Sequence, residues 1–307
     1  MQPQLTVIIP VYNGMPFLKE AVESILSQTY PNFSLLIIND GSTDGSTEYF
    51  NSLFEPRIKV IHQENIGLCC SLNKAVFEHT ESELIARLDQ DDISLPSRLE
   101  EQVNFMVQNP NYAAVLCQLT RIGADGRDFG YYQTPSKELI QDYDPSCGIV
   151  AHSTILFRRE KFIELGGYRQ ELYPVDDLDL SLRFCENAPV AVITKPLVKY
   201  RIHGNASTFQ VFWLMETKNR YVFEMSHRRK EGQAEIPFDE WVKLDTPPPV
   251  QQFIRYIKGV GRLFFREAGK LIGEGKKWEG GLYLIIAFCA YPSFVQRKLF
   301  ALRQGNK

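Results

Sequence analysis

The chain has 307 residues, enough for one large domain or for one domain with a smaller appendage. Its 44% hydrophobic and 12% aromatic content is typical of a protein with a packed core and excludes an intrinsically disordered chain. The net charge of −3 is unevenly distributed, because residues 250–307 carry eleven Lys or Arg and three Asp or Glu, a net +8, whereas the remainder carries −11. A basic tail on an acidic body predicts an anionic partner, either a membrane surface or a nucleic acid.

The N-terminal segment and the cysteines both indicate a reducing compartment. Residues 1–4 have no basic residue, and Pro10 interrupts the apolar run of residues 5–11, so we find no secretory signal and expect a cytosolic protein. The cysteines show neither CxxC pairs nor zinc-ligand spacing, which predicts free, mostly buried thiols. They are Cys69, Cys70, Cys117, Cys147, Cys185 and Cys289.

Strands and helices alternate through the first third of the chain. We expect strands over residues 5–11, 33–38, 58–62 and 84–88, and helices over about 16–30, 46–54 and 68–79. Because the expected strands are apolar throughout, they predict a parallel sheet that is covered by helices on both faces. Ligands of such sheets bind beyond the carboxyl ends of the strands.

The pattern changes twice further along the chain. After residue 113 it becomes mixed, and beyond Gln210 it becomes helical, with a candidate linker at 246–249. In the mixed region we expect strands near 113–119, 154–157 and 190–193 and helices near 159–165 and 178–186.

An acidic cluster closes the strand that ends at Leu88. Three carboxylates within four residues, Asp89, Asp91 and Asp92, repel one another unless a cation or a hydrogen-bonding ligand neutralises them. The alternative is a solvated turn that caps a helix beginning near Pro96.

Asp40 ends a second strand, so it is expected at the same edge of the sheet. There it can accept hydrogen bonds from a base or ribose, while Asp91 can bind a hard divalent cation that holds a diphosphate. Neither a Walker A nor a G-x-G-x-x-G sequence occurs at these sites, which argues against a P-loop or dinucleotide fold. The alternative for residues 40–46 is a helix-capping turn.

Taken together, these motifs resemble those of the family-2 inverting glycosyltransferases. The matching segments, in order, are Val7–Gly14, Ile37–Ser46, Asn65 with Gly67 and Asn73, Leu88–Asp92, and Val175–Leu180. The resemblance covers residues 5–208, although residues 68–71 depart from the small-residue and Arg pattern of the family. It implies the GT-A fold, an α/β, Rossmann-like, mostly parallel sheet flanked by helices, here with a C-terminal helical extension.

The resemblance also implies domains and roles. Residues 1–210 would form the nucleotide-sugar-binding and catalytic domain, 211–249 a helical segment and linker, and 250–307 a basic amphipathic tail. Asp91 would be the principal ligand of Mg²⁺ or Mn²⁺, with His203 reaching the metal or the diphosphate. The residues implied to bind the nucleotide sugar, with UDP the expected nucleotide, are Pro10, Tyr12, Asn13, Asp40, Asn65, Gly67, Asn73, Asp89, Gln90, Asp92 and Arg201.

The catalytic base is expected in the acidic motif at residues 175–180. The resemblance of this motif to the family's acidic motif places the base at Asp177, with Asp176, which stands where the family usually has Glu, as second choice. A base is needed because a sugar hydroxyl must lose its proton as it attacks the anomeric carbon. The alternative for Asp176 is that it caps the following helix. Asp92 would orient the motif or bind the donor sugar. Arg201 could equally pair with a surface carboxylate, and His203 could be a structural residue.

The tail leaves two interpretations. Residues 281–291 are apolar on all sides but are fewer than the roughly 20 needed to span a bilayer. The segment either packs as a helix pair on the catalytic domain or lies on anionic headgroups, which would place the protein peripherally on the inner face of the membrane. A glycan or lipid-linked acceptor in cell-envelope synthesis suits the second, and no nucleic-acid partner is expected.

Two other functions compete with sugar transfer. A non-catalytic nucleotide-sugar or glycan-binding module would keep the fold but lack a carboxylate, whereas Asp40, Asp89, Asp91 and Asp177 are all present. A nucleotidyltransferase would need a glycine-rich basic loop near the N-terminus, which the sequence lacks.

Overall fold

The computed structural model describes residues 3–131, 140–145, 151–203, 208–273 and 275–305. Contacts within the chain divide it into two compact units. The first comprises Met1–Ile122 and Gly130–Arg201, and the second comprises Gly123–Phe129 and Ile202–Lys307. Cys147 and residues 204–207, which end the motif that contains Arg201 and His203, lie outside the described residues.

A sheet with a parallel half forms the centre of the first unit. In this half the strands lie side by side in the order β3-β2-β1-β4, and every neighbouring pair runs parallel. The register aligns the carboxyl ends, because Val11 pairs with Asn39 and Ile8 pairs with Arg87. The strands are β1 (Leu5–Val11), β2 (Phe33–Asp40), β3 (Ile58–Gln63) and β4 (Leu84–Arg87).

The other half of the sheet continues in the order β9-β6-β10-β5, with β9 antiparallel to both β4 and β6. Its strands are β5 (Ile93–Ser94), β6 (Ala114–Gly123), β9 (Leu156–Arg158) and β10 (Val190–Ile202), with β7 (Asp128–Tyr131) beside β6 and β8 (Ile140–Asp142) beside β10. The strand expected at residues 190–193 is longer in the structure, where β10 extends to Ile202. The strand expected at 154–157 begins later, because His152–Thr154 forms a 3-10 turn, η1.

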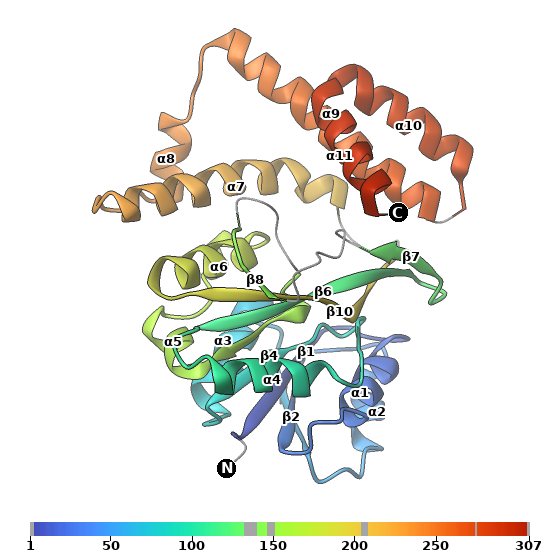
Figure 1. Ribbon diagram of the computed structural model, residues 1–307, viewed down its shortest axis with the longest axis vertical. Coiled ribbons are helices and arrows are strands. Elements are labelled where there is room, and N and C mark those ends of the chain that lie inside the picture. The colour runs from blue at the N-terminus through green and yellow to red at the C-terminus, as the bar shows by residue number, and fades with distance from the viewer. Residues whose placement is uncertain (1–2, 132–139, 146–150, 204–207, 274, 306–307) are drawn as a thin grey trace. The chain divides into compact units, whose positions relative to one another are not determined.

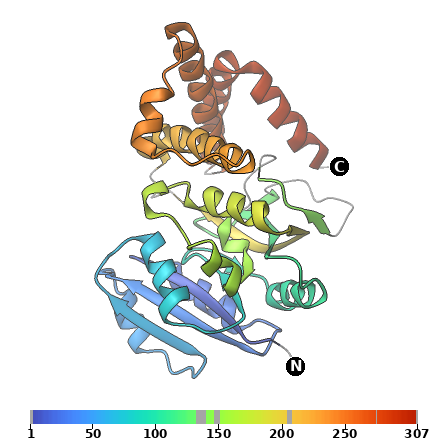
Figure 2. The ribbon, with the colours of Figure 1, turned by 90° about the vertical axis from the view of Figure 1, so that its left-hand side faces the viewer.

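Helices cover both faces of this sheet (Figures 1 and 2). Successive β1 side chains point to opposite faces, so that Val7 and Ile9 enter one core and Ile8 enters the other. The first face packs against α1 (Leu18–Leu26), α2 (Ser46–Asn51) and α4 (Arg98–Gln108). The second packs against α3 (Leu68–Glu78), α5 (Arg159–Glu164) and α6 (Asp176–Asn187). The predicted α/β class, with a central sheet between helical layers, is confirmed. The sheet is mixed, because the parallel half continues into strands paired antiparallel, so the expectation of a mostly parallel sheet holds only for β3-β2-β1-β4.

The second unit is mainly helical. Asp245 links two of its helices, because Oδ2 accepts a hydrogen bond from Arg220 Nη2 at 3.0 Å and Oδ1 accepts one from Arg255 Nη1 at 2.8 Å. Within the part of the chain that the structure describes, none of the helices has the length and apolar character needed to cross a bilayer. They are α7 (Thr208–Lys230), α8 (Phe238–Leu244), α9 (Pro249–Gly273), α10 (Lys277–Ala290) and α11 (Pro292–Gly305).

Candidate functional site

The loops that follow β1 and β2 are joined by hydrogen bonds between their polar side chains and backbones. Asn13, whose φ of 53° lies in the left-handed region, accepts a hydrogen bond at Oδ1 from the N–H of Thr43 at 2.8 Å. The N–H of Met15 donates to Asp44 Oδ2 at 2.7 Å. Asp44 Oδ1 also accepts from the N–H of Ser46 at 3.1 Å, at the start of α2, whose N-cap residue is Gly45. The two loops therefore form one preorganised wall at the edge of the sheet.

Gln90 connects the acidic cluster to the same wall. Its Nε2 donates to the carbonyl oxygen of Tyr12 at 3.1 Å, and the N–H of Tyr12 donates back to Oε1 at 2.9 Å. The Tyr12 side chain remains exposed, whereas Pro10 is buried in β1 opposite Ile38. Tyr12 is thus placed to present an aromatic face to a ligand, and Pro10 shapes the strand beneath it.

Asp40 organises the loop before α3. Its carboxylate accepts hydrogen bonds from Gln63 Nε2 at 2.8 Å and from the N–H groups of Ile66 and Gly67, each at 2.9 Å. Gly67 has a φ of 86°, a conformation that strains any residue with a Cβ. Asn65, which precedes this turn, is exposed. Most of the hydrogen-bonding capacity of Asp40 is therefore used within the protein, to shape the loop that carries Asn65.

Asn73 has a structural role. Its Nδ2 donates to the carbonyl oxygen of Tyr168 at 2.8 Å, and its Oδ1 accepts from the N–H of Tyr168, also at 2.8 Å. Both polar atoms of the amide therefore tie α3 to the loop after α5, whereas the resemblance implied a contact with the donor.

The three aspartates of the acidic cluster have different surroundings. Asp89 is half-buried and accepts a hydrogen bond from Arg87 at 2.8 Å, and Asp91 is half-buried at the tip of the turn. Asp92 is fully buried, and its Oδ1 accepts from the N–H of Arg201 at 2.9 Å. Burial and the charges of Asp91 and Asp89 raise the pKa of Asp92 well above its usual value. Asp92 is thus placed to orient the turn, while Asp89 and Asp91 remain reachable.

Arg201 stabilises this turn by hydrogen bonds to Asp91 and Asp92. It is buried, its Nε donates to the carbonyl oxygen of Asp91 at 2.9 Å, and its guanidinium pairs with Glu20 and lies over the ring of Phe17. Of the two roles considered for Arg201, the structure shows the ion pair with a surface carboxylate. His203 belongs to the second unit, so its predicted contact with the metal or the diphosphate stays a prediction.

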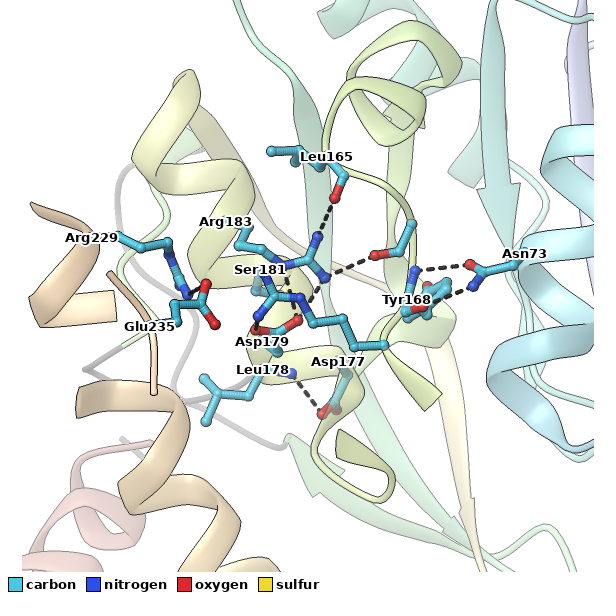
Figure 3. A network of polar contacts seen from close by, with 12 residues as sticks. Asn73, Leu165, Tyr168, Asp177, Leu178, Asp179, Ser181, Arg183, Arg229 and Glu235 are labelled. Atoms are coloured by element: carbon cyan, nitrogen blue, oxygen red, sulfur yellow. Dashed lines mark hydrogen bonds and ion pairs between the residues drawn. The ribbon is translucent and has the colours of Figure 1, made fainter. Parts of the chain in front are cut away.

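Asp176 and Asp177 begin helix α6. Val175 occupies the N-cap position, so the alternative in which Asp176 caps this helix is wrong. Asp177 lies deep in the protein but keeps an accessible edge, and its Oδ1 accepts a hydrogen bond from the N–H of Leu178 at 2.7 Å (Figure 3). Burial and the neighbouring charge of Asp176 raise the pKa of Asp177 to about 7. A general base is most effective when its pKa lies near the working pH, which is the property that Asp177 has.

A buried polar network connects the two acidic motifs. Arg87 bonds to Asp89 and reaches the hydroxyl of Tyr168 at 3.5 Å, and its charge lowers the pKa of Asp176 against the effect of burial. The Tyr168 hydroxyl contacts His152 Nδ1 at 3.1 Å, and His152 Nε2 contacts Ser181 Oγ on α6 at 2.9 Å. Burial and the Arg87 charge lower the pKa of His152 well below its usual value, so this imidazole is neutral.

Arg87 belongs to this network but was not among the site residues predicted from the sequence. A signal was nevertheless present, because an arginine within an otherwise apolar, buried strand needs a carboxylate partner, and Asp89 follows two residues later. The link to Tyr168 and α6 carried no such signal, since these residues are distant in the sequence and meet only in the fold.

The loop after α5 is held to α6 by Arg183, which also forms a second buried ion pair within α6. Arg183 Nη2 lies 2.6 Å from Asp179 Oδ2, and the same guanidinium donates to the carbonyl oxygens of Leu165 and Gly167, both at 2.8 Å (Figure 3). Because Tyr168 follows this loop directly, the Asp179–Arg183 pair fixes the position of the tyrosine beneath Arg87.

Comparisons with known sequences place the chain in a family. Residues 6–166, more than half of the chain, match the family described as glycosyl transferase family 2. The putative glycosyltransferase EpsE of Bacillus subtilis is 35% identical over 255 residues, which cover 80% of this chain and 88% of EpsE. The O-antigen biosynthesis glycosyltransferase WbnJ of Escherichia coli is 32% identical over 210 residues, which cover 66% of this chain and 81% of WbnJ.

Other relatives are longer or more distant. An uncharacterized glycosyltransferase of Rickettsia felis is 28% identical over 253 residues, and the match spans only 41% of its length. The crystal structure of S. aureus TarS 1–349 in complex with UDP-GlcNAc has a TM-score of 0.59 at 16% identity, covering 92% of this chain and 90% of TarS 1–349, which establishes a shared fold. The matched family and the relative that is 35% identical along most of its length lead to one conclusion: the chain belongs to glycosyl transferase family 2.

Proposed function

We propose that this chain is an inverting, metal-dependent glycosyltransferase that moves a sugar from a nucleoside-diphosphate sugar to an acceptor hydroxyl. UDP is the expected nucleotide, which the UDP-GlcNAc complex of the similarly folded TarS supports. The acceptor is expected to be a glycan or a lipid-linked sugar of the cell envelope, which the similarity to the O-antigen enzyme WbnJ supports. A cytosolic enzyme, peripheral on the inner face of the membrane, suits such an acceptor.

The surroundings of Asp177 are the observation that carries this proposal. A carboxylate with a pKa of about 7 is ionised in a large fraction of molecules at neutral pH, yet it is basic enough to take a proton from a sugar hydroxyl in the transition state. It stands beside Asp176, which Arg87 connects electrostatically to Asp89 in the other acidic motif. Base and donor-binding residues are therefore parts of one network.

The proposed reaction is a single displacement. The acceptor oxygen transfers its proton to Asp177 and forms a bond to the anomeric carbon, and the bond from that carbon to the diphosphate breaks with its electron pair going to the diphosphate. Attack from the face opposite the leaving group inverts the anomeric centre. Exposed Tyr12 and Asn65 and half-buried Asp89 line the edge where the nucleotide is proposed to bind.

A hard cation suits the acidic cluster. The described residues contain no group of three His, Cys, Asp or Glu side chains positioned as a protein-only metal cage. Mg²⁺ and Mn²⁺ need no such cage, because one or two carboxylates together with substrate phosphates and waters suffice. Buried Asp92 accepts a hydrogen bond from the N–H of Arg201 and so supports the turn that carries Asp91. Held by Asp91, the cation would neutralise the charge that develops on the leaving diphosphate.

The test measures nucleoside diphosphate released from a panel of nucleotide sugars, with envelope glycans as acceptors, in the presence and absence of Mn²⁺. We expect one donor to be consumed only with metal, and nuclear magnetic resonance of the product to show an inverted anomeric configuration. Asp177→Asn should abolish release while nucleotide binding, measured by calorimetry, persists. If no donor is consumed but a nucleotide sugar still binds, the chain is the binding module considered as the alternative. A retained configuration would overturn the single displacement.

A further inference from the structure

We propose that helix α10 is a docking surface for anionic lipid membranes, on which it lies parallel to the bilayer without crossing it. This rests on the peripheral membrane location in the proposed function and deepens it by naming the surface of the second unit that faces the lipid.

The most deeply buried residues of α10 are small, although half-buried Tyr283 also packs on Phe264 of α9. Among its residues only Gly280 and Ala287 are buried. A Cβ built on Gly280 would lie 2.5 Å from Ile272 Cγ1 and 3.0 Å from the carbonyl oxygen of Ala268, both on α9. Such close contact through small residues is the way helices pack when lipid surrounds them.

The large apolar residues of α10 point the other way. Trp278 is 89% exposed, Leu282 59% and Ile285 61%. At 100° per residue these three, together with exposed Ile286 and Phe288, fall within an arc of roughly 160° opposite Gly280 and Ala287. Small residues inward and large apolar residues outward is the reverse of a water-soluble helix pair, and it leaves an apolar stripe that needs a nonpolar environment.

Basic residues flank this stripe in the sequence. Lys276 and Lys277 precede it, and Arg297 and Lys298 on α11 follow it; all four are exposed, with Glu279 the one exposed acid on α10. The 58 residues from Val250 onward carry a net +8. Basic residues near an anionic bilayer strengthen membrane binding through their attraction to the headgroups. This charge favours lipid over a second copy of the chain, whose equally basic tail would repel it.

The length of α10 decides between lying on the membrane and crossing it. Its 14 residues span about 21 Å at 1.5 Å per residue, which is shorter than the roughly 30 Å hydrocarbon core. A helix of this length can insert its exposed apolar side to the level of the acyl boundary while Lys276 and Lys277 at its N-terminal end stay among the headgroups. Trp278 at one end of the stripe suits that boundary, where tryptophan is enriched.

The experiment is flotation of the full-length protein with vesicles of phosphatidylcholine alone or with about 30% phosphatidylglycerol. The double variant Leu282→Glu/Ile285→Glu places two charges in the stripe. Phe54→Glu is the matched control, because Phe54 is exposed and apolar but lies in the first unit. We expect wild type and Phe54→Glu to float with anionic vesicles, more weakly at high salt, and the double variant to lose at least tenfold in binding.

Light scattering and thermal unfolding of each variant show whether it stays folded and in which oligomeric state. Equal flotation of the double variant, or no flotation of wild type, would overturn the proposal. A wild-type dimer that the double variant converts to monomer would instead show that a second copy covers the stripe. Flotation needs neither donor nor turnover, so its result is independent of whether the proposed transfer reaction is correct.

Discussion

The Nε atom of Arg87 donates a hydrogen bond to Oδ1 of Asp89 at 2.8 Å, from a position that is almost fully buried. The guanidinium lies over the ring of Tyr168. Burial raises the pKa values of Asp176 and Asp177, and the positive charge of Arg87 offsets part of that rise. The positive charge of Arg87 therefore acts on both the acidic cluster after β4 and the acidic start of α6. We expect Arg87 to position Asp89 and to limit the rise in the pKa values of Asp176 and Asp177.

Arg87→Met should remove both effects. Because it leaves Asp89 and Asp176 without their counter-charge, we expect the free energy of unfolding to fall by about 3 kcal/mol, as in other broken buried pairs. The acidic limb of the pH–rate profile should move to higher pH, since the pKa of Asp177 rises when the cation is lost. Urea titrations and a pH–rate profile measure the two effects. Arg57→Met, which breaks a more exposed pair with Glu55, is the control and should change neither.

The rate of transfer should depend on the ionisation of Asp177. Since only the carboxylate accepts the acceptor's proton and its pKa is about 7, kcat/KM should rise with pH through the neutral region and level off above it. Asp177→Asn should lower the rate by about a thousandfold and abolish this limb. A variant that keeps both the rate and the limb would assign the base to another residue, Asp176 being the next to test.

The same pKa shift predicts that Asp177→Asn stabilises the fold at alkaline pH. The pKa of Asp177 is about 7 in the folded chain against a usual 3.8, so between these values the folded state holds a proton that the unfolded state has released. The contribution of Asp177 to the free energy of unfolding therefore falls as pH rises through this window and is constant above it. The difference in Tm between variant and wild type should be more positive at pH 8 than at pH 5. An equal Tm difference at pH 5 and at pH 8 would contradict a raised pKa of Asp177 in the folded chain.

Removal of divalent cations should abolish donor turnover. If Asp91 holds the cation and the cation holds the diphosphate, chelation by EDTA should stop nucleoside diphosphate release, and Mn²⁺ or Mg²⁺ should restore it. Asp91→Asn should weaken nucleotide binding in the presence of Mn²⁺ and have little effect in EDTA, a difference that calorimetry measures. Turnover that survives EDTA would refute the metal requirement.

Asp179 should be important for stability and not for chemistry. Asp179→Asn leaves buried Arg183 without its carboxylate, which should cost about 3 to 5 kcal/mol in the free energy of unfolding. Glu164→Gln removes an exposed partner of Lys161 on nearby α5 and is the matched control, with an expected cost of about 0.5 kcal/mol or less. If Asp179→Asn unfolds at the same urea concentration as the control, the pair adds little stability.

Local pattern was sufficient to predict the parallel half of the sheet. The β1 to β4 strands are short apolar runs bounded by Gly, Pro or Asp, and the bounds found in the structure agree with those expected to within about two residues. The start of α6 was less well predicted, because Asp176 looks like a cap in the sequence. Its position inside the helix depends on Val175, which is buried in the fold and takes the N-cap position.

The sequence by itself determined the family, the α/β architecture and the two acidic motifs at the sheet edge, because each depends on residues close together in the chain. Only the tertiary structure decided which polar groups remain available for a ligand. Asn73 and Arg201 look like binding residues in the sequence, yet Tyr168 and Glu20 engage them. The pKa of Asp177 and the exposed stripe of α10 are likewise set by burial and charge, which depend on neighbours that are far away in sequence and close in space.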